Sequence, residues 1–236
     1  AKVAAESVKA AKGRIPVLVG VTDVSIHRVM DRVEALKDID GIDGIVSTVP
    51  YYATVTQDNI YDFYNEIANR SGRHTYLYDL AVVTKTATAP ATVKRLWKNP
   101  LIKGIKSGNM VTQRLLHRAE DRPADFTMMY SNLDDFDIAY KWGIDKCLDG
   151  MCSCTPANTG KMFSAMAQGD YETAAQCLNK IVALRDAFLG WDLWPAYTTT
   201  MNLLGYEGSH NPDYCSPIKP EYVPQIREML QKIGEL

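Results

Sequence analysis

Short apolar segments of strand length alternate with helical patterns from residue 15 to residue 168. Each helical pattern repeats apolar residues at three- and four-residue spacing, which places them on one face of a helix. Strands that are each followed by a helix pair in parallel through right-handed crossovers. The alternation therefore predicts an α/β protein with a parallel sheet. The expected strands lie at residues 15–21, 44–49, 74–78, 101–107, 126–130 and 147–154.

The expected helices follow these strands, with one more before the first strand and three at the end of the chain. The first, over residues 2–12, is alanine-rich and is closed by Gly13, a usual helix stop. Because no strand separates the last three, we expect an α/β domain at residues 1–169 and C-terminal helices at residues 170–236. The helices are expected at residues 25–37, 57–69, 90–98, 110–118, 134–142 and 159–168, and then at 171–188, 195–204 and 221–233.

Charge and cysteine usage exclude several classes of partner. The formal net charge is −2, so the chain lacks the basic footprint that nucleic acid or an anionic membrane attracts. We expect a small neutral or acidic ligand instead. The five cysteines and four histidines lack metal-type spacing, so we expect no metal site and no cofactor. With no membrane-length apolar run and no signal-like segment, a soluble, cytoplasmic protein is expected.

Lys106 is the first candidate for chemistry. It stands at the carboxyl end of the expected strand 101–107, two residues after Gly104. In an α/β barrel the carboxyl ends of the strands form the active face. An amine held there in an apolar setting has a lowered pKa and can act as a Schiff-base nucleophile. The alternative explanation is a solvated lysine at the end of a strand.

Three short motifs give this position a context. The chain carries Val49-Pro-Tyr-Tyr52, Tyr76-Leu-Tyr-Asp79 and Gly104-Ile-Lys106, each at the end of an expected strand. They are similar to T-P-Y-Y, L-Y-N and G-I-K of the dihydrodipicolinate synthase / N-acetylneuraminate lyase family, in matching order and spacing. The chain resembles that family over essentially its whole length. The resemblance implies a (β/α)8 TIM barrel with a C-terminal helical appendix, and a pyruvate-handling class I aldolase.

The resemblance also implies roles for three residues. Lys106 would attack the ketone of a 2-oxo acid and form an imine. Tyr78 would shuttle protons beside it, although a core tyrosine with a satisfied hydroxyl is the alternative. Tyr52 would cross a subunit interface and complete a neighbour's proton relay, so a homo-oligomer, a dimer or a homotetramer, is expected. Plain aromatic packing is the alternative for Tyr52.

Five further residues are candidates for contact with the second substrate. Asp134 and Asp135 follow the expected strand 126–130, where carboxylates would accept hydrogen bonds from a sugar-like substrate or would instead cap a helix. Thr84 follows the strand that carries Tyr78. Cys152 and Ser153 lie in a stretch similar to the family's G-x-I-S-x-x-x-N, with a register uncertain by one residue. For Cys152, a buried small hydrophobic role is the alternative.

Two departures from the family pattern matter. The family's first two strands have no counterpart, and six parallel strands cannot close a barrel of eight. We therefore expect about two further strand–helix units upstream of Ala1, roughly sixty residues, with the loop that holds the pyruvate carboxylate among them. The other departure is Val83, which replaces the arginine that grips the carboxylate of aspartate semialdehyde in dihydrodipicolinate synthases.

The absence of that arginine directs the expected function. We expect a Schiff-base lyase or aldolase that cleaves or condenses pyruvate, or another 2-oxo acid, with an aldehyde, of the N-acetylneuraminate lyase or 2-keto-3-deoxy-sugar-acid aldolase kind. The partners would be a small 2-oxo acid and an aldehyde. Two alternatives stay open: a dihydrodipicolinate synthase (4-hydroxy-tetrahydrodipicolinate synthase) that grips its second carboxylate differently, and a non-catalytic 2-oxo-acid sensor.

Overall fold

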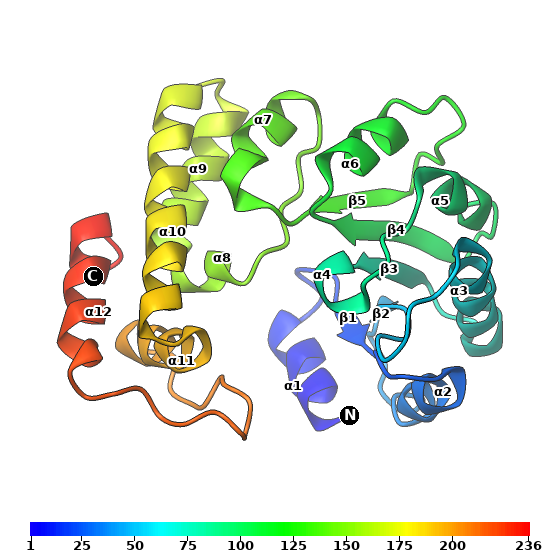
Figure 1. Ribbon diagram of the computed structural model, residues 1–236, viewed down its shortest axis with the longest axis horizontal. Helices are drawn as coiled ribbons and strands as arrows, with labels where there is room; N and C mark the ends of the chain where they lie inside the picture. Colours follow the sequence, from blue (N-terminus) through cyan, green and yellow to red (C-terminus); the bar gives the residue numbers. More distant parts are fainter. The chain divides into compact units, whose positions relative to one another are not determined.

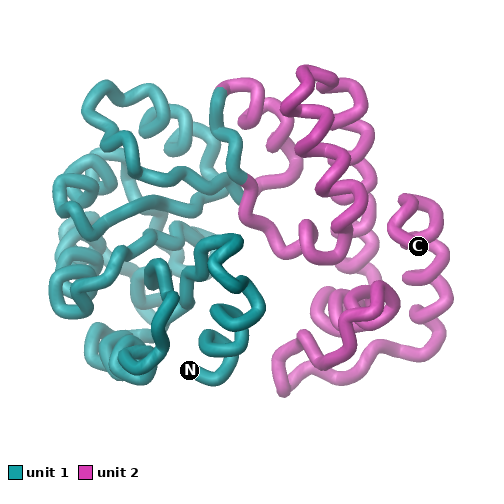
Figure 2. Tube along the Cα trace, turned by 180° about the vertical axis from the view of Figure 1, so that it is seen from behind, with its two compact units in different colours: residues 1–131, 143–146 teal, residues 132–142, 147–236 magenta.

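The computed structural model describes residues 1–236 and divides them into two compact units, coloured separately in Figure 2. Unit 1 comprises residues 1–131 and 143–146, and unit 2 comprises residues 132–142 and 147–236. The first holds a parallel sheet and the second is helical, so the expected parallel α/β protein with a C-terminal helical part is confirmed. The expected domain boundary at residue 169 and the upstream strand–helix units stay predictions.

Unit 1 is built on a five-stranded sheet in which the spatial order of the strands follows the chain. All four neighbouring pairs are parallel, as the alternation of strands and helices predicted. Tyr78 stands opposite Lys106 in the register of β3 and β4, and Asp79 stands opposite Ser107. The strands are β1 (Leu18–Gly20), β2 (Gly44–Ser47), β3 (Thr75–Asp79), β4 (Ile102–Ser107) and β5 (Thr127–Tyr130).

Three helices of unit 1, α2, α3 and α6, begin after a residue whose side chain caps them. The hydroxyl of Thr56 accepts the amide of Asn59, and the Asn59 side chain returns a bond to the amide of Thr56, which is a capping box. Asn109 caps the helix after β4, and Pro90 stands in the first turn of another helix. The helices are α1 (Lys2–Ala11), α2 (Ile26–Glu34), α3 (Gln57–Ser71), α4 (Ala81–Thr84), α5 (Pro90–Leu96) and α6 (Met110–His117).

One face of the sheet is covered by α2, α3, α5 and α6, as Figure 1 shows. Ile45, Leu77 and Ile105 on neighbouring strands are fully buried and join the apolar helix side chains in one core cluster. The residues between them on each strand face the opposite way. This alternation leaves Tyr76, Tyr78 and Lys106 half-buried on the other face of the sheet.

Unit 2 is helical throughout. The long helix α10 packs against α9, α11 and α12, and an aromatic cluster of Phe136, Tyr140 and Phe163 joins α7 to α9. None of the helices in either unit combines the length and the apolar character that crossing a bilayer requires. The elements of unit 2 are η1 (Leu133–Asp135), α7 (Phe136–Lys141), α8 (Met151–Cys154), α9 (Pro156–Ala167), α10 (Tyr171–Trp191), α11 (Leu193–Leu203) and α12 (Tyr222–Ile233).

The strand expected at residues 147–154 is wrong. Only an isolated bridge occurs at Cys147, and Met151–Cys154 forms the short helix α8. The Asp149 carboxylate accepts the amide of Met151, and the hydroxyl of Thr155 donates to the carbonyl of Met151. These local bonds turn the apolar run into a helical turn, because side chains that bond nearby backbone groups compete with strand pairing.

Candidate active site

Lys106 and Tyr78 meet at the carboxyl ends of β4 and β3. The Lys106 Nζ donates a hydrogen bond of 2.8 Å to the phenolic oxygen of Tyr78, and it lies 4.0 Å from the centre of the Tyr78 ring. The contact follows from the sheet register, which pairs the two residues directly. The structure thus brings together the two side chains that the sequence assigned to imine formation and proton transfer, while their catalytic roles stay predictions.

The ring of Tyr76 fills the space behind this pair. A Cβ at Gly104 would lie 2.9 Å from the Tyr76 ring and 2.4 Å from the carbonyl oxygen of Thr127. A Cβ at Gly44, on the strand to the other side, would lie 2.8 Å from the same ring. The glycine before Lys106 is therefore needed for close packing of Tyr76 and β5, and the room that it leaves is occupied.

Asp79 joins three segments around the pair, and the sequence analysis did not identify it as a site residue. Its side chain is only 7% exposed. One carboxylate oxygen accepts the hydroxyl of Ser107 at 2.7 Å, and the other accepts the amide of Thr88 at 2.8 Å. Asp79 therefore links the end of the Lys106 strand to the loop that follows the Tyr78 strand. Asp79 and Ser107 are polar residues at the ends of neighbouring strands, and this placement is the sequence signal that could have indicated their contact.

The loop after β3 does not present the hydroxyl of Thr84 to Lys106. Thr84 is buried, and its hydroxyl lies 3.2 Å from the carbonyl oxygen of Leu80 and 3.0 Å from that of Thr86. Its neighbour Val83 is 46% exposed. A direct role of Thr84 in binding the second substrate stays a prediction, and in this structure its side chain stabilises the loop.

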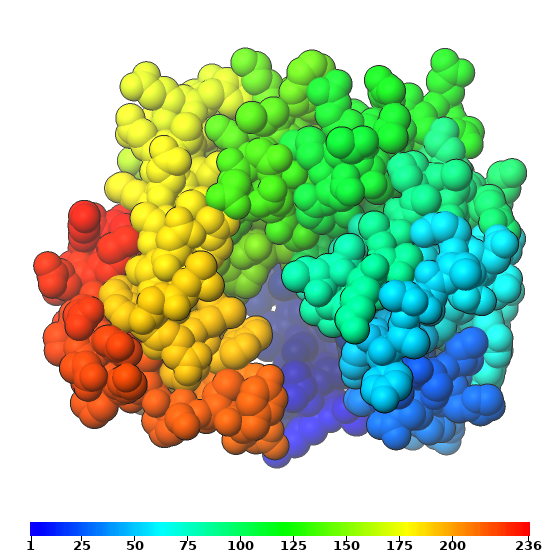
Figure 3. Space-filling model, in the orientation of Figure 1, coloured from blue at the N-terminus to red at the C-terminus, as the bar shows by residue number.

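Tyr52 lies on the segment between β2 and α3, with 88% of its surface exposed. It forms no hydrogen bond to Lys106 or Tyr78. Gln57 ties the start of α3 to the loop after β3, because its side chain donates to the Ala87 carbonyl and accepts the Ala89 amide. The cyan segment at the start of α3 and the turquoise segment around α4 both lie on the face of unit 1 that Figure 3 shows. The expected role of Tyr52 at a subunit interface stays a prediction.

Asp134 and Asp135 belong to unit 2. The Asp134 carboxylate accepts two hydrogen bonds from the Arg185 guanidinium, at 2.7 and 2.9 Å, and this cation lowers the pKa of Asp134. Asp135 occupies the N-cap position of α7 but makes no side-chain cap hydrogen bond. Sequence spacing gave no signal for Arg185, which lies about fifty positions further along the chain. Substrate contacts by either aspartate stay predictions.

Cys152 and Ser153 both lie on α8 in unit 2. A hydrogen bond with the Cys147 thiol outweighs burial and lowers the pKa of Cys152 to about 7. Burial raises the pKa of Tyr197, and the nearby Ser153 side chain opposes this shift. Burial likewise raises the pKa of Cys154 to about 12. The role of Cys152 and Ser153 in substrate binding stays a prediction, but the thiol environment marks Cys152 as chemically distinct from its neighbour.

Neither unit contains a cluster of side chains that could bind a metal ion. The structure contains no group of three or more His, Cys, Asp or Glu side chains that could hold a metal ion. The Lys106 amine is hydrogen-bonded to a phenol, and the next residue, Ser107, is hydrogen-bonded to the buried carboxylate of Asp79. This arrangement suits amine chemistry with proton transfer by a phenol.

Comparison with known proteins gives a consistent result. The model of the dihydrodipicolinate synthetase family matches residues 1–233. A protein of Koribacter versatilis named 4-hydroxy-tetrahydrodipicolinate synthase is 27% identical over 241 residues, covering 99% of this chain and 76% of the relative. A protein of the same name from Kosmotoga olearia is 30% identical over 205 residues, covering 85% and 69% of the two chains.

Solved structures agree on the fold. A monomeric variant of dihydrodipicolinate synthase superimposes with a TM-score of 0.88 at 21% identity, covering all of this chain and 79% of the other. The dihydrodipicolinate synthase of Thermotoga maritima gives a TM-score of 0.86 at 21% identity, covering all of this chain and 81% of the other. These relatives are TIM barrels, so the strands and helices of this chain follow a TIM-barrel arrangement.

Proposed function

Because the chain belongs to the dihydrodipicolinate synthetase family, whose members are class I, pyruvate-dependent Schiff-base lyases and aldolases, we propose that Lys106 is its imine-forming residue. The observation that carries the proposal is the 2.8 Å hydrogen bond between the Lys106 Nζ and the hydroxyl of Tyr78. A phenol beside an amine can relay a proton, because it can accept one from the nitrogen as it passes its own to the next group.

The steps follow from this pair. The neutral amine of Lys106 attacks the ketone carbon of pyruvate and forms a carbinolamine. Protonation of the carbinolamine hydroxyl, with Tyr78 as the proton carrier, expels water and leaves the imine. Loss of a methyl proton gives an enamine, which attacks the carbonyl carbon of an aldehyde; hydrolysis of the imine then releases the product and the free lysine. Carbon–carbon cleavage is the same sequence reversed.

For the aldehyde, the names of the relatives favour a 4-hydroxy-tetrahydrodipicolinate synthase, which condenses pyruvate with aspartate semialdehyde. The relatives' names therefore favour the synthase over the sugar-acid lyase that the sequence alone suggested. Val83 supports the second candidate, cleavage of a polyhydroxylated 2-oxo acid. An apolar side chain cannot form the bidentate contact that arginine gives a carboxylate, and leaving a buried carboxylate without a partner is costly.

Trapping of the imine tests the proposal. Incubation with pyruvate and borohydride should add a reduced pyruvyl group to the peptide that contains Lys106. Lys106→Ala should lose both the adduct and turnover. Lys103→Ala is a matched control, since Lys103 lies on the same strand but pairs with Asp125. An adduct on another lysine, or none, would contradict the assignment.

An aldehyde screen then separates the candidates. Efficient condensation of pyruvate with aspartate semialdehyde supports the synthase, and release of pyruvate from a polyhydroxylated 2-oxo acid supports the lyase. A stable adduct at Lys106 without turnover of any aldehyde supports the 2-oxo-acid sensor.

A further inference from the structure

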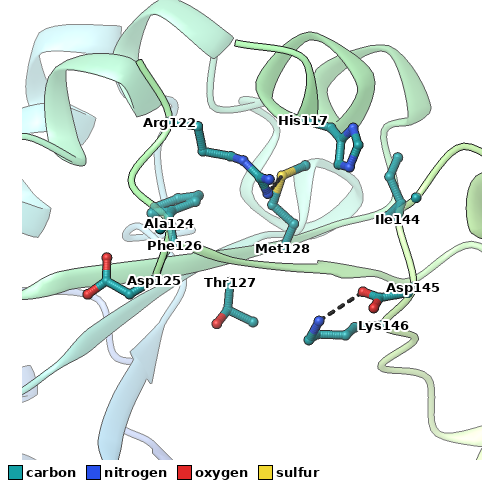
Figure 4. Close-up of a pocket in the computed structure, with 11 residues that line it drawn as sticks. His117, Arg122, Ala124, Asp125, Phe126, Thr127, Met128, Ile144, Asp145 and Lys146 are labelled. Carbon is teal, nitrogen blue, oxygen red and sulfur yellow. Dashed lines mark hydrogen bonds and ion pairs between the residues drawn. The ribbon is translucent and has the colours of Figure 1, made fainter. Parts of the chain in front are cut away.

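A cavity lies in unit 1, at the amino end of β5 and away from Lys106. Its volume is about 420 Å³, and it is bounded by the end of α6, by residues 122–128 and by residues 143–146 (Figure 4). Lys106 pairs with Met129 further along β5, whereas the cavity is lined by Thr127 at the start of that strand. None of the residues assigned to the imine chemistry lines this cavity.

Two donor side chains in the cavity have no acidic partner. The Arg122 guanidinium makes a single contact, from Nη1 to the Met128 sulfur at 3.5 Å, and forms no ion pair. His117 forms no hydrogen bond. A Cβ at Gly143 would lie 3.0 Å from the His117 ring, and Gly143 has a φ of +87°, so a glycine is needed at this contact. The ring is therefore packed closely against the backbone beside the cavity.

The carboxylates at the cavity are already neutralised. Asp125 forms an ion pair with Lys103, and Asp145 pairs with Lys146 at 2.8 Å. Arg122 is thus the cation of this cavity that no carboxylate balances. A thioether is a weak acceptor, so it cannot replace the hydrogen bonds that a partly buried guanidinium loses from water.

From this charge arrangement we propose that the cavity binds a small anion, a carboxylate or a phosphate, through Arg122 and His117. Arginine presents paired donors that match the two oxygens of either group. Imidazole adds one further donor from the neighbouring wall, since His117 and Arg122 both line the cavity. The proposal does not depend on the reaction at Lys106.

Calorimetric titration of the purified protein with inorganic phosphate, and separately with acetate, tests the proposal and distinguishes the two kinds of anion. We expect saturable binding of at least one of them. Arg122→Gln should weaken it by at least about tenfold, the usual worth of a charge-assisted hydrogen bond, and His117→Asn should also weaken it. Arg118→Gln is the matched control, because it makes the same charge change at an exposed residue outside the cavity.

Absence of saturable binding of both anions would overturn the proposal. So would binding that survives Arg122→Gln, or binding that is weakened equally by Arg118→Gln. Arg122→Lys keeps the positive charge and guards against a folding defect: it should bind more weakly than the wild type and more tightly than Arg122→Gln. The pyruvate adduct at Lys106 should form in every Arg122 variant. Loss of anion binding with the adduct intact therefore concerns the cavity alone, and absence of the adduct in the wild type concerns the imine proposal alone.

Discussion

The Lys106 Nζ lies 2.8 Å from the phenolic oxygen of Tyr78, and the parallel register of β3 and β4 sets the two residues directly opposite each other. For Lys106 to attack a ketone, its ammonium form must first lose a proton, and the phenol is within hydrogen-bond distance of that nitrogen. The imine chemistry proposed for Lys106 would therefore have a candidate proton carrier in contact with the amine.

Replacing Tyr78 tests whether its phenol carries the proton. Tyr78→Phe keeps the ring but removes the hydroxyl, so it should slow imine formation and turnover by about 10²- to 10⁴-fold, the usual contribution of a proton shuttle. The rate of borohydride-trappable adduct formation measures the first effect. Tyr76→Phe is the control, since it keeps the ring that packs between Gly44 and Gly104. Equal rates for Tyr78→Phe and wild type would show that another group carries the proton.

Asp79 should connect stability to catalysis. Asp79→Ala leaves the Ser107 hydroxyl and the Thr88 amide without their buried acceptor. The free energy of unfolding, measured in urea, should fall by about 1–3 kcal/mol. Asp79→Asn keeps one acceptor oxygen, so its free energy of unfolding should fall by less than that of Asp79→Ala. Asp40→Ala, at an exposed position, serves as the control and should change stability little.

The catalytic effect of Asp79 should come through position alone. Asp79 faces away from the side of β3 that carries Tyr78, so it acts by holding the end of β4 and the following loop. Below the temperature at which the variant unfolds, we expect a lower kcat with partial rescue by Asp79→Asn. If Asp79→Ala were destabilised but kept the wild-type kcat, Asp79 would be a structural residue only.

The ion pair of Asp134 and Arg185 makes stability depend on pH. Arg185 holds the pKa of Asp134 below its ordinary value, so the pair stabilises the fold above the unfolded-state pKa of about 3.9. That contribution is lost as the pH falls through the folded-state pKa. Because both side chains are partly exposed, Arg185→Gln should lower the free energy of unfolding by no more than about 1 kcal/mol at neutral pH. Thermal melts between acidic and neutral pH measure the difference, which should vanish in acid.

The same variants bear on substrate binding. If Asp134 binds the second substrate, Asp134→Asn should raise the KM for the aldehyde more than Arg185→Gln does, although both break the same ion pair. Equal KM values in the two variants would leave Asp134 with the structural role alone.

The pairing of Lys106 with Tyr78 could be predicted from the sequence because it depends on strand periodicity. Alternation along β3 and β4 fixes which side chains share a face, and parallel pairing brings the strand ends together. The hydrogen bond from Gln57 to Ala87 and the ion pair of Arg185 with Asp134 could not be predicted. Both join residues about thirty to fifty positions apart through side chains. Periodicity carries no information about such contacts.

The failure at residues 147–154 has a different cause. The run is apolar enough for a strand, but Asp149 and Thr155 bond the backbone of Met151 within a few residues. Such local competition decides between a strand and a helical turn when the segment is short. Cys152 was consequently expected on a strand and is found on the helix α8.

The helical turn places the Cys152 thiol within reach of the Cys147 thiol. Contact with the Cys147 thiol lowers the pKa of Cys152 to about 7, whereas burial raises that of Cys154 to about 12. Since the thiolate is the nucleophile, alkylation of Cys152 by iodoacetamide should rise with pH through a midpoint near 7. Cys154 should stay unmodified at the same pH. Peptide mass spectrometry over a pH series measures both residues in one sample.

Removal of the contact tests its cause. Cys147→Ala should move the midpoint of Cys152 alkylation upward, toward the ordinary thiol value of about 8.5, because burial then acts without the opposing hydrogen bond. Cys177→Ala is the matched control, since this buried cysteine on α10 is not among the groups that shift Cys152. An unchanged midpoint in Cys147→Ala would assign the lowered pKa to the Thr159 hydroxyl or the Asp149 backbone instead.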